Sequence, residues 1–102
     1  MHFEIRSNGD TSVICLDGRF VFNSHAGFRE AYEQVLACGE TRVIQLDMGK
    51  VEYLDSSALG MLLLLREKGQ AQDKTVRIRG AQGMARQVLE VANFHKIFDM
   101  VP

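Results

Sequence analysis

The hydrophobic residues of this chain follow two kinds of spacing, and the strand-like kind opens the sequence. Short β-prone runs at 2–6 and 12–16 flank Ser7–Asp10, where asparagine and glycine favour a tight turn. The pattern predicts a β-hairpin, with Asp17 and Gly18 ending its second strand.

Helical spacing begins after this hairpin. Apolar residues recur every three or four positions beyond Asn23 and Ser24, either of which can cap a helix, and Gly39 stands where the helix would end. These apolar residues are Phe28, Ala31, Tyr32, Val35 and Leu36. The spacing therefore predicts an amphipathic helix between Ser24 and Gly39.

The middle of the chain predicts a strand followed by a core helix. Residues 42–48 are rich in branched apolar side chains and indicate a buried, central strand, after which a loop is expected at 49–55. The predicted helix at 57–68 is apolar nearly all round in its first two turns, so most of its sides must be covered by other elements.

The last third of the chain continues the alternation of strand and helix. Residues 74–79 predict a strand, 82–93 a helix, and 97–101 a short strand or helix end. The helix carries one apolar stripe, which consists of Met84, Val88, Val91 and Ala92. Alternation after an initial hairpin predicts one α/β domain over residues 1–102, with a mixed sheet of four to five strands packed against three to four helices.

Composition and charge narrow the classes of partner. Of the 102 residues, 46% are hydrophobic and 25% charged, a balance typical of a folded globular domain rather than a disordered chain. The formal net charge of -1 provides no general attraction to nucleic acid or to an acidic membrane. Arginine alternates with apolar residues at 75–79, which indicates a strand with a solvated face rather than a phosphate-binding patch. Neither nucleic acid nor membrane is expected as a partner.

Cysteine and histidine positions favour no metal or other cofactor. Cys15 and Cys38 lack the spacing of a metal-binding pair and lie in or beside apolar patterns, so both are expected to be buried free thiols. His2, His25 and His95 are scattered along the chain without ligand-like spacing.

A cytoplasmic location is expected on three grounds. Free thiols suit a reducing compartment. The start of the chain, Met1–Arg6, carries charge where a signal peptide has an apolar core. The longest apolar run is also well short of the ~20 residues that a membrane-spanning helix needs.

Three polar residues, Asp55, Ser56 and Ser57, stand directly before the most apolar stretch of the chain. Either Asp55 or Ser56 can cap the predicted helix by accepting a hydrogen bond from an unpaired amide, a contribution of about 1 kcal/mol. A serine at such a helix start is also held at the surface, and a phosphate on it would face free amides and the positive end of the helix dipole. The segment therefore predicts a cap and a site that can carry a phosphoryl group without unfolding.

The hexapeptide Asp55–Gly60 carries a resemblance to a known family. Its sequence, Asp-Ser-Ser-Ala-Leu-Gly, is similar to the signature Asp-Ser-Ser/Thr-Gly-Leu-Gly of the STAS domain in bacterial anti-sigma factor antagonists. Leu46–Met48 and Val51–Leu54 precede it as in that family. The hairpin ending at Gly18, the helix-strand-helix order and the closing segment Leu89–Phe98 extend the resemblance over essentially the whole chain.

This resemblance implies a phosphorylation switch that has no catalytic activity of its own. In the family the first serine after the aspartate is the regulatory phosphorylation site, which corresponds to Ser56, and Asp55, Ser57 and Ala58 are assigned with it to the partner-binding surface. The unmodified protein would bind an anti-sigma factor or another regulatory target, and the phosphorylated protein would release it. A serine kinase, often the anti-sigma factor itself, would add the phosphate, and a metal-dependent serine phosphatase would remove it.

The chain departs from the family pattern within the hexapeptide. Ala58 stands where the family commonly has glycine, so a methyl group is added beside Ser56. Alanine favours a helix more than glycine does, and the methyl group is expected to narrow the set of kinases that dock.

A second departure follows Gly18. The family usually has an acid there, whereas Arg19–Asn23 supplies aromatic residues and no acid. Alternation predicts that Phe20 and Phe22 face one side and Val21 the other, so either set could form an apolar docking surface. Phe22 and Asn23 are therefore included in the partner-binding set. The aromatic loop favours a target other than a sigma-factor kinase, such as a separate anti-sigma protein or a signalling enzyme.

Other functions stand beside the switch. The domain could be an interaction or sensing module that is never switched. A hydrolase with Ser56 as its nucleophile would need a Gly-x-Ser-x-Gly elbow, which residues 54–58 lack. Gly80–Gly83 lacks the Lys-Ser/Thr of a phosphate-binding loop and predicts only a turn, so nucleotide hydrolysis is not indicated.

Overall fold

The first two strands form the predicted hairpin in the computed structural model, which describes residues 1–102. β1 (His2–Asn8) pairs antiparallel with β2 (Thr11–Phe20). Gly9 has a φ of 63°, a conformation that the tight turn requires and that glycine adopts without strain.

The remaining elements alternate as predicted from the spacing of apolar residues. The chain continues through a 3-10 turn η1 (Phe22–Ser24), helix α1 (His25–Ala37), strand β3 (Val43–Leu54), helix α2 (Ser56–Gln70), strand β4 (Thr75–Arg79), helix α3 (Gly83–Val91), a second 3-10 turn η2 (Phe94–Lys96) and strand β5 (Asp99–Val101). The prediction of a single α/β domain with a mixed sheet and an N-terminal hairpin is confirmed.

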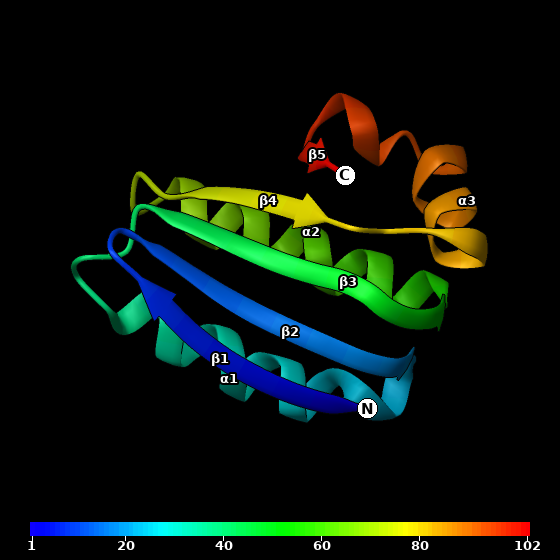
Figure 1. Cartoon of the computed structure of the whole chain (residues 1–102), viewed down its shortest axis with the longest axis horizontal. Coiled ribbons are helices and arrows are strands. Elements are labelled where there is room, and N and C mark those ends of the chain that lie inside the picture. The colour runs from blue at the N-terminus through cyan, green and yellow to red at the C-terminus, as the bar shows by residue number, and fades with distance from the viewer.

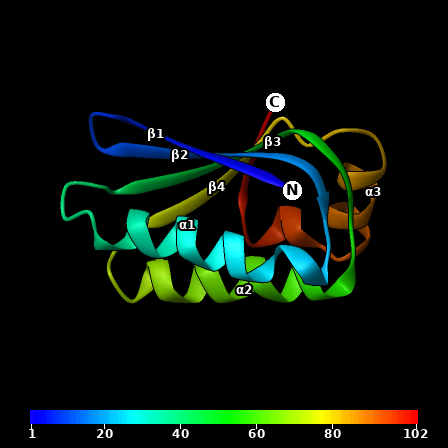
Figure 2. The ribbon, with the colours of Figure 1, turned by 90° about the horizontal axis from the view of Figure 1, so that it is seen from below.

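The five strands lie in the order β1-β2-β3-β4-β5, and every pair except β1 with β2 is parallel (Figure 1). Helices α1 and α2 cover one face of this sheet, and α3 lies at its end beside β3 (Figure 2). None of the helices combines the length and the apolar character needed to cross a membrane.

The core lies between the sheet and the two covering helices. Along β3, Ile44, Leu46 and Met48 are fully buried, while the residues between them face the opposite side, because successive strand residues alternate between faces. Leu62 and Leu65 of α2 are also fully buried, as predicted, but Leu63 is 41% exposed, so the prediction that most sides of this helix are covered is confirmed only for the side that faces the sheet.

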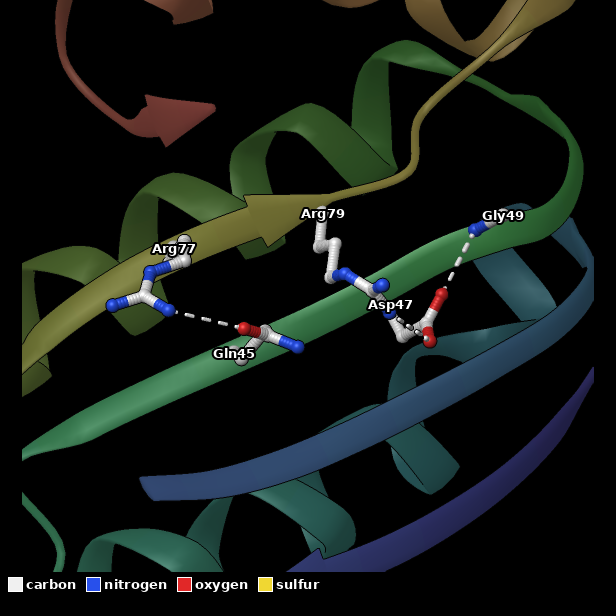
Figure 3. Close-up of polar contacts among 5 residues, drawn as sticks. All are labelled: Gln45, Asp47, Gly49, Arg77 and Arg79. Atoms are coloured by element: carbon white, nitrogen blue, oxygen red, sulfur yellow. Dashed lines mark hydrogen bonds and ion pairs between the residues drawn. The ribbon is translucent and has the colours of Figure 1, made fainter. Parts of the chain in front are cut away.

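The other face of the sheet carries polar side chains (Figure 3), and neither α1 nor α2 covers it (Figure 2). The Nη1 group of Arg77 donates to Oε1 of Gln45 at 3.2 Å, and Oδ1 of Asp47 accepts the amide of Gly49 at 3.2 Å. Arg79 lies 3.8 Å from Oδ2 of Asp47. The solvated strand face predicted at 75–79 is confirmed.

The second strand is longer than predicted. β2 continues through Asp17 and Gly18 to Phe20, and its register against β3 shifts on either side of Gly18. Gly18 has a φ of 116°, which glycine alone adopts readily, so β2 passes through this residue rather than ending at it, and the extra residues at both register shifts lie in β3.

The loop predicted at 49–55 is wrong for all but its last residue. β3 runs to Leu54, because its second half pairs in parallel with the extended end of β2, up to Phe20 opposite Leu54. Only Asp55 separates the strand from α2.

The two cysteines are free, but they are not buried as predicted. Cys15 is half-buried because it alternates with the core residues Ile14 and Leu16 and faces the open side of the sheet. Cys38 follows the last residue of α1 and is exposed.

Candidate functional site

The site forms where two parallel strands end side by side. Phe20, the last residue of β2, is the register partner of Leu54, the last residue of β3. The amide of Asp55 donates to the carbonyl of Phe20 at 3.2 Å, which continues the pairing one step further. The turn that follows β2 and the N-terminus of α2 are therefore fixed next to each other.

Asp55 is the N-cap of α2 and also joins the two segments. Its Oδ1 accepts the backbone amide of Ala58 at 2.9 Å and the hydroxyl of Ser57 at 2.6 Å. Its Oδ2 accepts the amide of Phe22, across the site, at 3.2 Å. Of the two capping residues that the sequence allowed, the structure selects Asp55.

The turn after β2 is held by a buried serine. The hydroxyl of Ser24 donates to the carbonyl of Arg19 at 3.1 Å and accepts the amide of Val21 at 3.2 Å. With these two hydrogen bonds in place, Phe22 and Asn23 are exposed. The centroid of the Phe22 ring lies 5.0 Å from the centroid of the His25 ring. The turn is thus an ordered surface.

The two serines of the site have different roles. Ser57 is half-buried, and its hydroxyl donates to Asp55. Ser56 is exposed, and its hydroxyl takes part in no hydrogen bond of the structure. Of these two serines, only Ser56 presents a free hydroxyl at the surface.

Ala58 was assigned to the partner-binding set, but its position in the structure does not fit that assignment. Its side chain is fully buried, because it lies on the core side of the first turn of α2. The added methyl group therefore packs in the interior and cannot narrow the choice of kinase by contact. The other five assigned residues, Phe22, Asn23, Asp55, Ser56 and Ser57, are at least partly accessible.

The two phenylalanines before the site also differ from the prediction. Phe20 is fully buried, whereas Phe22 is 70% exposed. Strand alternation stops at Phe20, and the 3-10 turn rotates Phe22 to the surface. Phe20 and Phe22 therefore do not share a face.

An apolar groove borders the site, and its position was not expected from the sequence. Helix α3 buries Ala85 and Leu89, and its longer apolar stripe faces outwards, with Met84 55% and Val91 84% exposed. The groove between this stripe and α2 is lined by Leu59, Met84, Gln87, Val88, Val91 and Ala92. Leu59 lies one helical turn after Ser56, so the groove begins one turn along α2 from the residue with the free hydroxyl. The sequence signal that could have predicted the buried side of α3 is the four-residue spacing of Ala85 and Leu89.

The charge of the site is negative. Hydrogen bonding holds the pKa of Asp55 below its ordinary value, chiefly through the Ser57 hydroxyl; desolvation, the next largest effect, opposes this, and the amides of Ala58 and Phe22 lower the pKa further. Glu52 is exposed nearby on β3, and the guanidinium of Arg19 lies 5.0 Å from the centroid of the Tyr53 ring. No group of three or more His, Cys, Asp or Glu side chains is arranged to hold a metal ion.

The lowered pKa of Asp55 leads to a pH prediction. A group whose folded pKa lies below its unfolded value of 3.8 stabilises the fold above that pH, and the contribution disappears as the pH falls through the folded pKa. Wild type should therefore exceed Asp55→Asn in free energy of unfolding by about 0.3 to 1 kcal/mol near pH 6, and the difference should shrink below about pH 4. Urea unfolding of both proteins between pH 6 and 2.5 measures this. A difference that stays constant over the range would contradict it.

Comparison with known proteins gives matches over nearly the whole chain. The family model described as "Mlab, STAS domain" matches residues 3–102. A STAS-domain containing protein of Pseudomonas aeruginosa strain UCBPP-PA14 is 37% identical over 92 residues, which cover 90% of this chain and 89% of that protein.

Solved structures share the fold at lower identity. An anti-sigma factor antagonist from Mycobacterium paratuberculosis has a TM-score of 0.87 at 19% identity, covering 99% of this chain and 85% of that one. The Bacillus cell fate determinant SpoIIAA in its phosphorylated form has a TM-score of 0.74 at 17% identity, covering 99% and 92%. The unphosphorylated form of SpoIIAA also gives 0.74, at 15% identity, covering 99% and 87%.

Proposed function

The chain belongs to the STAS domain family, and on that premise we propose that it is a protein-binding switch controlled by phosphorylation of Ser56. The unphosphorylated form binds an anti-sigma factor or another regulatory target in the cytoplasm. Phosphorylation by a serine kinase releases the target, and a metal-dependent serine phosphatase restores the binding form. The chain itself is the substrate of these enzymes and catalyses no reaction.

The observation that carries this proposal is the free hydroxyl of Ser56. It is exposed at the start of a helix whose core side is buried at Ala58, Met61 and Leu62, and it makes no hydrogen bond that modification would break. The cap is supplied by Asp55, and Ser57 supports Asp55, so a phosphate on Ser56 leaves the structural contacts in place. Relatives of this fold are known in phosphorylated and unphosphorylated forms, and this chain superposes equally well on both forms of SpoIIAA.

The chemistry of the surface supports release by phosphorylation. Phe22 is 70% exposed and donates its amide to Asp55, the residue before Ser56, while Leu59, one helical turn after Ser56, lines the apolar groove, so both segments next to the hydroxyl carry apolar surface. A phosphoryl group adds about -1.5 to -2 charges beside the ionised Asp55. A partner that fits the neutral hydroxyl then meets repulsion and the cost of desolvating a phosphate.

The turn after β2 bears on the kind of target. Where antagonists of sigma-factor kinases usually have an acid after the glycine, this chain presents the exposed ring of Phe22 and the amide side chain of Asn23. An aromatic anchor of this kind favours a partner with an apolar pocket. A separate anti-sigma protein or a signalling enzyme therefore fits the surface better than a sigma-factor kinase.

Phosphate mapping tests the site directly. After incubation with its cognate serine kinase and ATP, the wild-type protein should carry one phosphate on Ser56. Ser57→Ala should still be modified, because only its contact with Asp55 is lost, and Ser56→Ala should not. Mass mapping of the tryptic peptides measures this. Phosphate on other residues, with Ser56→Ala modified in full, would refute the site assignment.

A further inference from the structure

β1 is an edge strand that is paired on one side only. It lies at the end of the sheet order, and its seven residues are bonded to β2 alone (Figure 1). An uncovered edge of this length offers a row of free backbone donors and acceptors to another strand. Such an edge is a place where a second chain can extend the sheet.

Hairpin geometry identifies the residues that face the open edge. Asn8 and Thr11 flank a two-residue turn, so they exchange hydrogen bonds with each other, and such pairs recur at every second residue. The even-numbered residues of β1 are therefore bonded to β2. Phe3, Ile5 and Ser7 direct their amides and carbonyls outwards, and none of these groups takes part in a turn, loop or cap hydrogen bond.

We propose that the occupant of this edge is the β1 strand of a second copy of the chain, paired antiparallel about a two-fold axis at Ile5. In this register Ile5 faces Ile5 of the second copy, and Phe3 faces Ser7, so that the outward residues meet as hydrogen-bonded pairs. About six backbone hydrogen bonds then join the two copies. The ten-stranded sheet runs continuously through both copies.

Charge complementarity selects this register. Glu4 and Arg6 are exposed on the open face of the sheet, where they form an ion pair within one strand at 3.4 Å. With Ile5 on the axis, Glu4 lies opposite Arg6 of the second copy in both halves of the pair, which stabilises a non-hydrogen-bonded cross-strand pair. Moving the register by two residues in either direction places Glu4 opposite Glu4 or Arg6 opposite Arg6, and both arrangements repel.

A groove borders the edge strand on its helix side. This groove between β1 and α1 is lined by Met1, His2, Phe3, Glu4, Ile5, Gly27, Glu30, Ala31 and Gln34. At Gly27 a Cβ atom would lie 2.6 Å from the Phe3 ring, so α1 packs closely against β1, while no strand pairs with the outer edge of β1. Ile5 is half-buried, and pairing with its counterpart would remove the remainder of its side chain from water.

The edge is separate from the site at Ser56. Neither Phe22 nor Ser56 belongs to β1 or to the groove beside it, so the dimer would present two independent binding sites. This inference does not depend on the proposed phosphorylation switch.

Sedimentation equilibrium over a wide range of protein concentrations tests the dimer. The wild-type chain should dimerise with a dissociation constant of about 1 to 100 µM, because the interface is small. Glu4→Arg and Arg6→Glu each place like charges opposite each other twice and should weaken the dimer by about tenfold or more. The double variant with both exchanges restores opposite charges in every pair and should dimerise like wild type. Circular dichroism checks that all four proteins are folded.

Amide hydrogen exchange provides a second, residue-level measurement. The amides of Phe3, Ile5 and Ser7 should become protected as the concentration rises, whereas those of Glu4 and Arg6 should be protected at every concentration. A chain that stays monomeric at millimolar concentration overturns the proposal and leaves the edge to a strand of a different protein. A dimer that is unaffected by the single exchanges, or a folded double variant that does not recover, overturns the interface.

Discussion

Ser56→Asp is expected to bind the regulatory target about a hundredfold more weakly than wild type, a change of about 2.7 kcal/mol in binding free energy. The added carboxylate follows Asp55, which is already ionised, and the apolar side chains of Phe22 and Leu59 belong to the two segments next to it. Ser56→Ala should bind at least as well as wild type under all conditions, since it cannot be phosphorylated. Capture from extracts with Ser56→Ala and Ser56→Asp as paired baits identifies the target, and calorimetric titration then gives both affinities.

The matched control for charge alone is Gln72→Asp. This residue is exposed in the turn after α2, at the opposite end of the 15-residue helix, so the same charge is added far from the site. Its affinity should equal that of wild type. If Ser56→Asp also binds as wild type does, the domain is an interaction module without a phosphorylation switch.

The fold was predictable to the extent that each element has its own periodic signal. The turn around Gly9, the helical spacing from Phe28 to Leu36 and the apolar run of α2 each indicate one structure without reference to the rest of the chain. The extension of β2 and β3 past Gly18 and Gly49 was not predictable in this way. These residues are held in strands by pairing with each other, and the local sequence carries the turn-like glycines instead.

The residues of the site also differ in how far the sequence could predict them. Asp55 and Ser56 could be assigned because capping is a local interaction with a local signature. The contact from Asp55 to the amide of Phe22 spans 33 positions and depends on the register of two strands, which no short motif encodes. The sequence did not predict that the longer apolar stripe of α3 faces outwards. Periodicity indicates that this helix has an apolar side. Only tertiary packing decides whether that stripe or the side with Ala85 and Leu89 is covered.

The rigidity of the site depends on a cluster of aromatic rings beneath it. Phe28 of α1 is fully buried, with its ring centroid 4.9 Å from Phe20, 5.3 Å from Tyr32 and 6.3 Å from Phe3. Phe20 is the last residue of β2 and accepts the amide of Asp55, so the cluster connects the helix layer to the base of the site.

Phe28→Ala is therefore expected to lower the free energy of unfolding by about 3 to 5 kcal/mol, because it leaves a cavity among rings that cannot close around it. Phe22→Ala is the matched variant: its ring is 70% exposed, so stability should change by no more than about 0.5 kcal/mol. The same change should weaken target binding about tenfold or more, as loss of an exposed aromatic anchor does. Urea unfolding and calorimetric titration of both variants separate the two effects. A Phe22→Ala protein with full affinity would remove the aromatic turn from the binding surface, and a Phe28→Ala protein with wild-type stability would show that the cluster does not support the site.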